Sequence, residues 1–146
     1  MIDKQFIGKT MPEFSVTAEA GQLRFFAKAT GETNPVHFDE SAARDAGHPA
    51  LPLPPTFLFS LELEQPNTGW REEVGIEMAR ILHGEESFTY HRQAYAGDVL
   101  RFQCRIADIY DKKGGALEFV VRETRVTNQH GEHVADLRSV LVQRNG

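Results

Sequence analysis

The spacing of apolar residues changes near Arg80, and this change limits the possible folds more than any other feature of the sequence. Before Arg80 the apolar residues recur at helical spacing or lie in stretches broken by proline. After it they alternate with polar residues, as Leu100, Phe102, Cys104 and Ile106 do. A period of two is typical of strands that turn one face toward a core. The sequence therefore predicts helices and loops first, followed by an antiparallel sheet.

Two helices are predicted early in the chain. We expect Thr17 to cap a helix over Ala18–Ala29, because a threonine hydroxyl can accept one of the free amide hydrogens of the first turn. Gly31 is expected to end it, since glycine adopts the left-handed conformation readily. By the same reasoning Asp39 caps a shorter helix over Glu40–Ala46.

A third helix and four strands complete the prediction. The helix begins at Thr56, and its segment Phe57–Leu63 is apolar on nearly all sides, which requires burial. Four strands follow Arg80, and the breaks at 96–98, 113–115 and 128–131 are each interpreted as a hairpin connection. We expect one α+β domain over residues 1–146, with the sheet wrapped around a long central helix. The pattern alone does not select one such fold among several.

Composition excludes several classes of function. The formal net charge is −5, so neither a nucleic acid nor an anionic membrane is an expected partner. No stretch approaches the roughly 18 apolar residues that a membrane span needs. The first residues have no signal-peptide pattern, and the expected compartment is the cytoplasm. The single cysteine, Cys104, excludes a disulfide framework, and its alternation with apolar residues places it in a core.

The loop between the two early helices carries the most informative chemistry. Glu32 and His37 are five residues apart there, and Pro35 stiffens the chain between them. Adding water to an activated double bond, or removing it, requires proton transfer at two carbons. A carboxylate and an imidazole can share that work. We therefore regard Glu32 and His37 as the candidate acid–base pair.

The same reaction needs hydrogen-bond donors at a thioester oxygen, where negative charge develops. Backbone amides at the start of the buried helix are suitable, and Pro54 and Pro55 have none to offer. Thr56 and Phe57 are therefore the candidate donors, and Asn34 is a further candidate for substrate binding.

Several segments resemble a known family. Phe26–Asp39 (FAKATGETNPVHFD) resembles the hydratase motif of MaoC-like proteins, which include the (R)-specific enoyl-CoA hydratases. The resemblance continues through Pro54–Phe57, through Tyr90–Asp98 and through Glu123–Gly131. These later segments resemble the variant described as the N-terminal MaoC-like, or fatty-acid-synthase-like, dehydratase domain.

The resemblance implies a hot-dog fold assembled as a dimer, either of identical chains or with a related hot-dog chain. It implies a hydro-lyase that acts on 2-enoyl or 3-hydroxyacyl thioesters of coenzyme A or acyl carrier protein and uses no cofactor. The family motif places an aspartate after the glycine and a histidine after Asn-Pro-X. His37 matches that histidine, but Glu32 replaces the aspartate. The extra methylene moves the carboxylate by more than an ångström, a displacement that can cost on the order of a hundredfold in rate.

Simpler interpretations remain open for each residue. Glu32 is also consistent with a solvated loop carboxylate, and His37 with a structural histidine that joins loop to helix. Asn34 has the character of a turn former, because its side chain can bond its own backbone. Thr56 can be an ordinary first residue of a helix.

Two other functions also remain open. One is a non-catalytic subunit that binds the acyl chain or supports a catalytic partner. The other is a hot-dog thioesterase, in which a carboxylate on the central helix activates water. Glu62 and Glu64 are the candidates for that carboxylate, although both have the pattern of surface residues at a helix end.

No metal site is expected. His130 and His133 flank a predicted turn, but their spacing is unusual for a pair on a strand and the sequence near them supplies no third ligand. Lys28, Arg92 and Lys112–Lys113 are candidates for contact with coenzyme A phosphates, and the sequence favours none of them.

Overall fold

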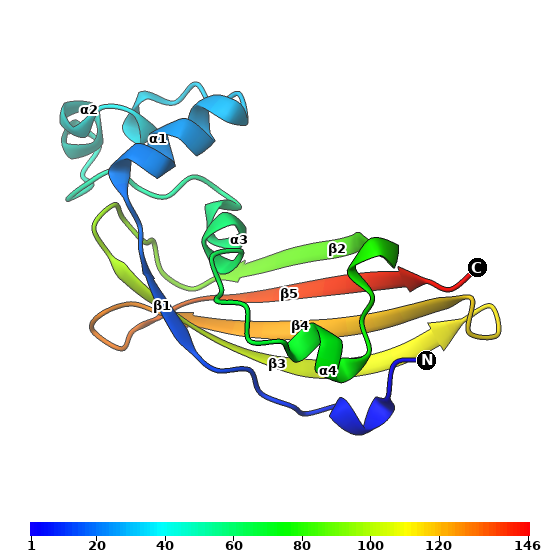
Figure 1. Ribbon diagram of the computed structural model, residues 1–146. Helices are drawn as coiled ribbons and strands as arrows, with labels where there is room; N and C mark the ends of the chain where they lie inside the picture. The colour runs from blue at the N-terminus through cyan, green and yellow to red at the C-terminus, as the bar shows by residue number, and fades with distance from the viewer.

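The computed structural model describes residues 1–146 and is built on a five-stranded antiparallel sheet, which confirms the α+β class (Figure 1). The strand order is β1-β3-β4-β5-β2. The strands are β1 (Phe14–Thr17), β2 (Ile81–Tyr90), β3 (Val99–Lys112), β4 (Leu117–Thr127) and β5 (His133–Arg144).

Two of the three predicted hairpins are present. Residues 113–115 join β3 to β4 and residues 128–131 join β4 to β5, and each pair of strands is hydrogen-bonded along its length. The prediction is wrong for residues 96–98, because β2 pairs with β5 and not with β3. Turn residues mark where a strand ends, but they do not determine which strand it pairs with. The chain after β2 therefore crosses the end of the sheet before β3 begins.

Helix α1 spans Ala20–Ala29, so the predicted start at Ala18 and the predicted cap at Thr17 are wrong. Thr17 is the last residue of β1 and pairs with Val99. The Ala18 amide donates to the Asp98 carbonyl at 2.9 Å, and the Ala18 carbonyl accepts from Gly97 at 2.8 Å. Because both backbone groups are bonded to the β2–β3 connection, the helix begins only after them.

Helix α2 spans Glu40–Asp45, and its predicted cap is confirmed, since the Asp39 carboxylate accepts from the Ser41 amide at 2.7 Å. Single turns of 3-10 helix, η1 (Lys4–Phe6), η2 (Pro35–His37) and η3 (Met78–Arg80), complete the connections.

The central helix, α3 (Phe57–Glu62), is much shorter than the long helix that we predicted. Pro66 explains the difference, because a proline ring clashes with the carbonyl four residues earlier, which here belongs to Glu62. Phe57 is buried, but Leu63 just beyond the helix is 64% exposed, so the apolar run is not enclosed on all sides. A second short helix, α4 (Trp70–Val74), then covers the other end of the sheet.

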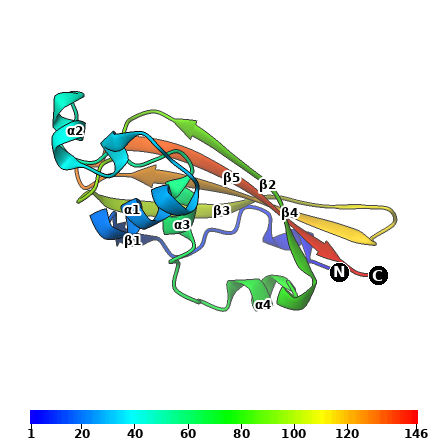
Figure 2. The same ribbon diagram turned by 90° about the horizontal axis from the view of Figure 1, so that it is seen from above.

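Figure 2 shows α1, α3 and α4 on one face of the sheet, with α1 and α3 near one end and α4 nearer the other. The core is divided in the same way. Leu23 of α1 is fully buried in one cluster with Leu100 and Phe102 of β3. Trp70 of α4 and Ile106 of β3 belong to a separate cluster. Cys104 is buried in that second cluster, as its alternation predicted. None of the helices has the length and apolar character to cross a bilayer.

Candidate active site

A groove of about 580 Å³ lies where the motif loop meets the end of β2. Two of the five candidate site residues, Asn34 and His37, line it, and Glu32, Thr56 and Phe57 do not. Its apolar wall comes from the proline-rich segment before α3 and from α3 itself, and its polar rim comes from the residues after β2. The walls include Pro52, Leu53, Pro54, Leu58, Tyr90, His91, Arg92 and Val134.

His37 is buried at the base of this loop, where its Nδ1 lies 2.8 Å from the Pro52 carbonyl oxygen. A carbonyl can only accept, so Nδ1 carries the hydrogen and Nε2 of the neutral ring holds the lone pair. The η2 turn fixes the ring, because the Asn34 side chain accepts from the Val36 amide at 3.2 Å and Pro35 opens the turn. The site therefore contains an oriented imidazole whose basic nitrogen is not used in this bond.

Glu32 is held by its own loop. Its carboxylate accepts from the Thr33 amide at 2.9 Å and from the Asn34 amide at 3.0 Å. The amides of Asn34 and Thr33, followed by nearby His37, hold the pKa of this carboxyl below its ordinary value. Glu32 is therefore a carboxylate at neutral pH, placed beside the groove but outside its lining.

The amides of Thr56 and Phe57 are both bonded within the chain. The Thr56 N–H donates to the Tyr90 hydroxyl oxygen at 3.0 Å, and the Phe57 N–H donates to the Pro54 carbonyl at 3.2 Å. The Phe57 ring packs in the core against Phe26. Thr56 has a φ of 71°, a conformation that is costly for a β-branched residue and is often found at functional sites.

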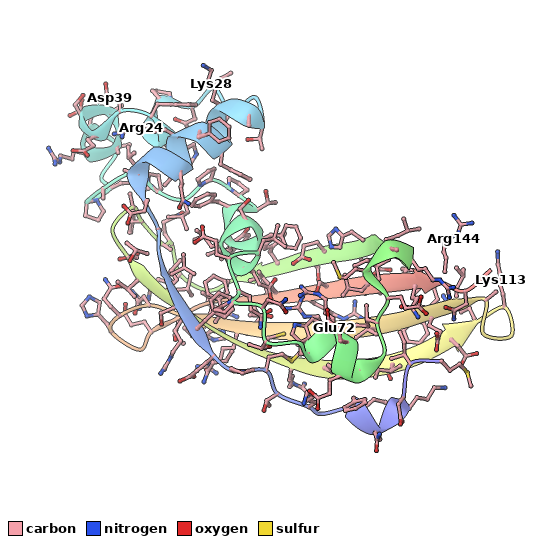
Figure 3. The ribbon with its side chains drawn as sticks, viewed as in Figure 1. Arg24, Lys28, Asp39, Glu72, Lys113 and Arg144 are labelled. Carbon is pink, nitrogen blue, oxygen red and sulfur yellow. The ribbon has the colours of Figure 1, made fainter.

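Tyr90 and Arg92 were not singled out by the sequence analysis as candidates for the acid–base site. The Tyr90 ring stacks on Phe88, and its hydroxyl accepts the Thr56 amide while keeping its own hydrogen to donate. The Arg92 guanidinium lies 3.3 Å from the Glu132 carboxylate at the rim of the groove. Of the basic residues considered for coenzyme A, only Arg92 lines the groove. Figure 3 shows Lys28 and Lys113 at opposite ends of the molecule.

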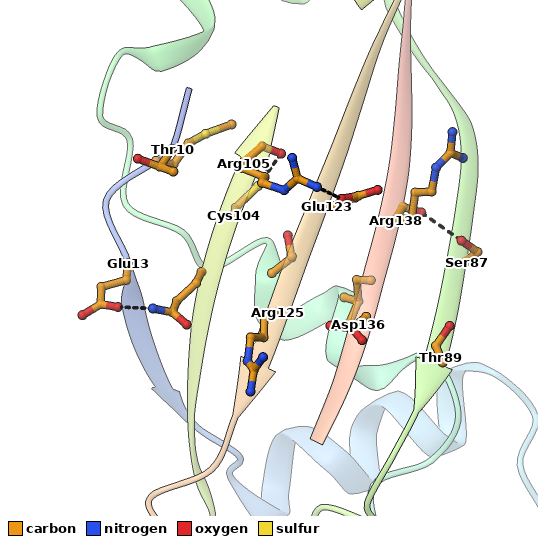
Figure 4. A pocket seen from close by; sticks show the side chains of 14 residues that line it. Thr10, Glu13, Ser87, Thr89, Cys104, Arg105, Glu123, Arg125, Asp136 and Arg138 are labelled. Atoms are coloured by element: carbon orange, nitrogen blue, oxygen red, sulfur yellow. Dashed lines mark hydrogen bonds and ion pairs between the residues drawn. The ribbon is translucent and has the colours of Figure 1, made fainter. Parts of the chain in front are cut away.

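A larger depression, of about 860 Å³, lies over the opposite face of the sheet (Figure 4). Successive side chains of a strand point to opposite faces, so Gln103 and Arg105 face outward where Cys104 faces the core. Only 3 of its 14 lining residues are hydrophobic, and Arg105 forms an ion pair with Glu123 across it. An acyl chain needs apolar walls. The smaller groove beside His37 is therefore the better candidate site.

Glu62 is not the surface residue that its position at the helix end suggested. It is 4% exposed, and its carboxylate lies 3.4 Å from the Arg122 guanidinium and accepts from the Thr124 hydroxyl. The Arg122 guanidinium also lies over the Trp70 ring. Glu64 does reach the surface, where it accepts from Gln22. Neither carboxylate lines the groove.

Glu86 on β2 belongs to the same polar layer beneath α3. Burial, together with the nearby charge of Glu62, raises its pKa to about 7, and Arg122 opposes this shift. One of its carboxyl oxygens has no hydrogen-bond partner, and the other lies 3.2 Å from His83 Nε2.

Comparison with known proteins agrees with this architecture. The family described as "FAS1-like, dehydratase domain region" matches residues 5–137. A UPF0336 protein of Saccharopolyspora erythraea is 33% identical over 146 residues, which cover 98% of this chain and 92% of that protein.

Two solved structures are also similar. One is the C-terminally truncated HadBC (3R-hydroxyacyl-ACP dehydratase) complex of Mycobacterium tuberculosis, with a TM-score of 0.80, 28% identity, and coverage of 94% of this chain and 96% of that chain. The other is a MaoC-like dehydratase, with a TM-score of 0.84, 25% identity, and coverage of 95% of this chain and 42% of that chain. They confirm the hot-dog fold and the resemblance to MaoC-like proteins that the sequence motifs indicated.

Proposed function

Because the chain belongs to the family of FAS1-like dehydratase domain regions, we propose that it interconverts a 2-enoyl and a 3-hydroxyacyl thioester by acid–base catalysis. The observation that carries this proposal is the orientation of His37. Its Nδ1 bond to the Pro52 carbonyl leaves the lone pair on Nε2, in a groove whose apolar wall suits an acyl chain.

In the hydration direction, a water oxygen bonds to C3 of the enoyl group and the double bond shifts toward the thioester. The proton lost by that water passes to the Glu32–His37 pair, and the pair delivers a proton to C2. Dehydration is the reverse, and neither direction consumes a proton overall. The lowered pKa keeps Glu32 ionised but makes it a weak base, so its carboxylate is proposed to orient the attacking water by accepting a hydrogen bond from it.

Tyr90 is the proposed donor to the thioester oxygen. Its hydroxyl oxygen already accepts a hydrogen bond from the Thr56 amide, so the hydroxyl hydrogen points away from Thr56. The αL conformation of Thr56 directs its amide at the Tyr90 hydroxyl. The Thr56 amide, which the sequence suggested as a donor, therefore acts on the groove through Tyr90. Such a donor stabilises the charge that develops on the oxygen during proton transfer.

Arg92 is the proposed contact for the carrier, which is coenzyme A or an acyl carrier protein. Both carriers present phosphate, and a guanidinium at the groove rim suits that group. Its partner Glu132 is itself partly exposed, so the pair can open without leaving a buried charge.

The test is a spectrophotometric assay of the purified chain with crotonyl-CoA. Loss of the enoyl absorbance without release of free thiol is expected for a hydratase. Release of thiol at a rate equal to the loss of thioester would instead support a thioesterase and contradict the proposal.

A non-catalytic subunit is the second candidate, and one observation favours it. The Glu32 carboxylate is bonded to its own loop and, unlike His37, does not line the groove in the single chain. The dehydratase of M. tuberculosis that resembles this chain is described as a complex. If the chain is inactive alone and with a related hot-dog partner, but Glu32→Asp starts turnover, this second candidate is the correct one.

A further inference from the structure

A cluster of three side chains that can bind a metal ion lies at the end of the sheet. None of the three has a role in the proposed reaction. We propose that His91, His133 and Asp136 bind a divalent first-row metal ion, of the class that includes Zn²⁺. Their ligand atoms all lie within 4.8 Å of one another. His91 Nε2 is 2.8 Å from one Asp136 carboxylate oxygen, and His133 Nε2 is 2.8 Å from the other.

A β-bulge creates this cluster. His133 and Asp136 are three residues apart on β5, and in a regular strand they would point to opposite faces of the sheet. The pairing of β4 with β5 shifts register here, since Val126 pairs with Ala135 whereas Thr127 pairs with His133. Val134 is the extra residue of the bulge, and it interrupts the alternation of side chains between the two faces. His133 and Asp136 therefore point to the same side of the sheet. A bulge that redirects a side chain is common beside functional sites.

The third ligand comes from β2, which lies beside β5. Thr89 pairs with Asp136 and Tyr90 with Ala135, so the next residue of the β2 chain, His91, lies opposite the bulge. The His91 amide donates to the Val134 carbonyl at 2.8 Å, which fixes the backbone that carries the ring. The two imidazole centroids are 4.2 Å apart, with both Nε2 atoms turned to one carboxylate.

The donor set suits zinc and its neighbours in the first transition row. Two imidazoles and one carboxylate are typical ligands of Zn²⁺, Ni²⁺, Cu²⁺ and Fe²⁺, and they are poor ligands for Ca²⁺ or Mg²⁺. A tetrahedral ion with bonds of about 2.0 Å holds its ligand atoms about 3.3 Å apart. The carboxylate oxygens lie 2.8 Å from the imidazole nitrogens, so small side-chain rotations admit an ion. The fourth position opens to solvent, because the His91 side chain is 39% exposed.

The position of the site gives it a structural consequence. His91 and Val134 also line the groove beside His37. An ion at this point ties the chain leaving β2 to the start of β5, and thereby fixes the rim that carries Tyr90 and Arg92. The sequence analysis expected no metal site, because it found no third ligand near His130 and His133. The topology supplies two ligands, one from the adjacent strand and one from farther along β5.

The experiment uses the full chain without an affinity tag, freed of metal with a chelator and then titrated with Zn²⁺ by calorimetry. Binding of one ion per chain is expected, together with a rise of several degrees in the thermal unfolding midpoint. Co²⁺ is the second probe, and a visible absorption band that Zn²⁺ abolishes is expected at the same stoichiometry.

His91→Gln, His133→Gln and Asp136→Asn are each expected to weaken Zn²⁺ binding at least tenfold. His130→Gln is the matched control, because His130 lies on the turn just before β5 and outside the cluster. His83→Gln is the control for a histidine paired with a single carboxylate. Both controls should bind as the wild type does. Circular dichroism shows which variants fold. A folded His91→Gln or His133→Gln is sufficient by itself to test whether the cluster binds the ion.

Absence of saturable Zn²⁺ and Co²⁺ binding to the wild type would overturn the proposal and leave the cluster as a hydrogen-bonded clasp. Equal loss of binding in His130→Gln would also overturn it. Because neither readout uses turnover, the result does not depend on whether the chain is a hydratase.

Discussion

At the scale of single residues, the bond between His37 Nδ1 and the Pro52 carbonyl matters most, because it fixes which nitrogen can move a proton. His37→Ala is expected to lower kcat by about 10²- to 10⁴-fold, as is usual when a general acid–base group is removed. The variant also loses one buried hydrogen bond, which costs about 1 kcal/mol. Stopped assays with crotonyl-CoA, alongside circular dichroism, separate the two effects. An unchanged rate would show that this histidine is structural.

Glu32 requires a pair of substitutions, because its role depends on reach as well as charge. Glu32→Gln removes the carboxylate and is expected to abolish nearly all turnover. Glu32→Asp keeps the charge and has the shorter reach of the family motif, so activity is expected to be retained or to rise. Glu40→Gln serves as the control, because Glu40 is an exposed carboxylate on α2 that pairs with Arg44. Wild-type rates in Glu32→Gln would remove this residue from the mechanism.

Tyr90→Phe tests the donor to the thioester oxygen. The ring and its stacking on Phe88 are preserved, so only the hydroxyl is lost. Because the hydroxyl is proposed to act in the transition state, kcat is expected to fall on the order of a hundredfold with little change in KM. Steady-state kinetics over a range of crotonyl-CoA concentrations provide the measurement. A rise in KM at constant kcat would indicate a binding role instead.

The sequence predicts which residues belong to the site where those residues are close together in the chain. His37 and Asn34 are three residues apart in one short loop, so a groove lined by one of them is readily lined by the other as well. Glu62 was misjudged because its partner Arg122 is 60 residues away. Local periodicity shows a charged residue at a helix end, and only tertiary packing shows that this end faces the sheet.

At the scale of elements, the polar layer between α3 and the sheet contributes to the pH dependence of stability through Glu86. Burial holds the pKa of Glu86 at about 7, against an ordinary value of 4.5. The folded chain therefore binds this proton more tightly than the unfolded chain does. The stabilising contribution is full below about pH 4.5 and is lost as the pH rises through 7. The charged or titratable groups that face Glu86 are Glu62, Arg122 and His83.

Glu86→Gln is therefore expected to flatten the decline in stability between pH 5 and about pH 8. At about pH 8 the variant should be more stable than the wild type by up to about 3 kcal/mol. Urea unfolding at several pH values measures this difference. Glu85→Gln is the matched control, since Glu85 is the neighbouring exposed carboxylate and pairs only with Arg138. A parallel pH profile in Glu86→Gln and the wild type would contradict the raised pKa.

The strands from β3 to β5 and their two hairpins were predictable, because alternation and turn residues act locally. The pairing of β2 with β5 was not, since no local signal records which edge a strand joins. The start of α1 was misplaced for a similar reason. Ala18 has a helical neighbourhood in sequence, but its backbone is bonded to Gly97 and Asp98, far along the chain.

At the scale of the whole molecule, the sheet has two unequal edges. The β1 edge is a strand of 4 residues, whereas the β2 edge is a strand of 10 residues whose outer side pairs with nothing in this chain (Figure 1). A long free edge offers unpaired amides and carbonyls to another chain. Exposed apolar residues lie along and near that edge, with Leu82 at 53% and Met78 at 56%. Such a surface is typical of an interface.

The chain is therefore expected to form a dimer through β2, either with itself or with a related hot-dog chain, and to sediment as a dimer at micromolar concentration. A stable interface buries at least about 1,000 Å², and a charge placed within it would be desolvated without a partner. Leu82→Lys should consequently shift the protein to monomer. Val99→Lys is the control, because Val99 is exposed to a similar degree but lies on β3 beside β1, away from the β2 edge. Sedimentation velocity distinguishes the species. A wild-type chain that is monomeric alone and in the presence of a related chain would contradict the prediction, and equal dissociation in both variants would place the interface elsewhere than the β2 edge.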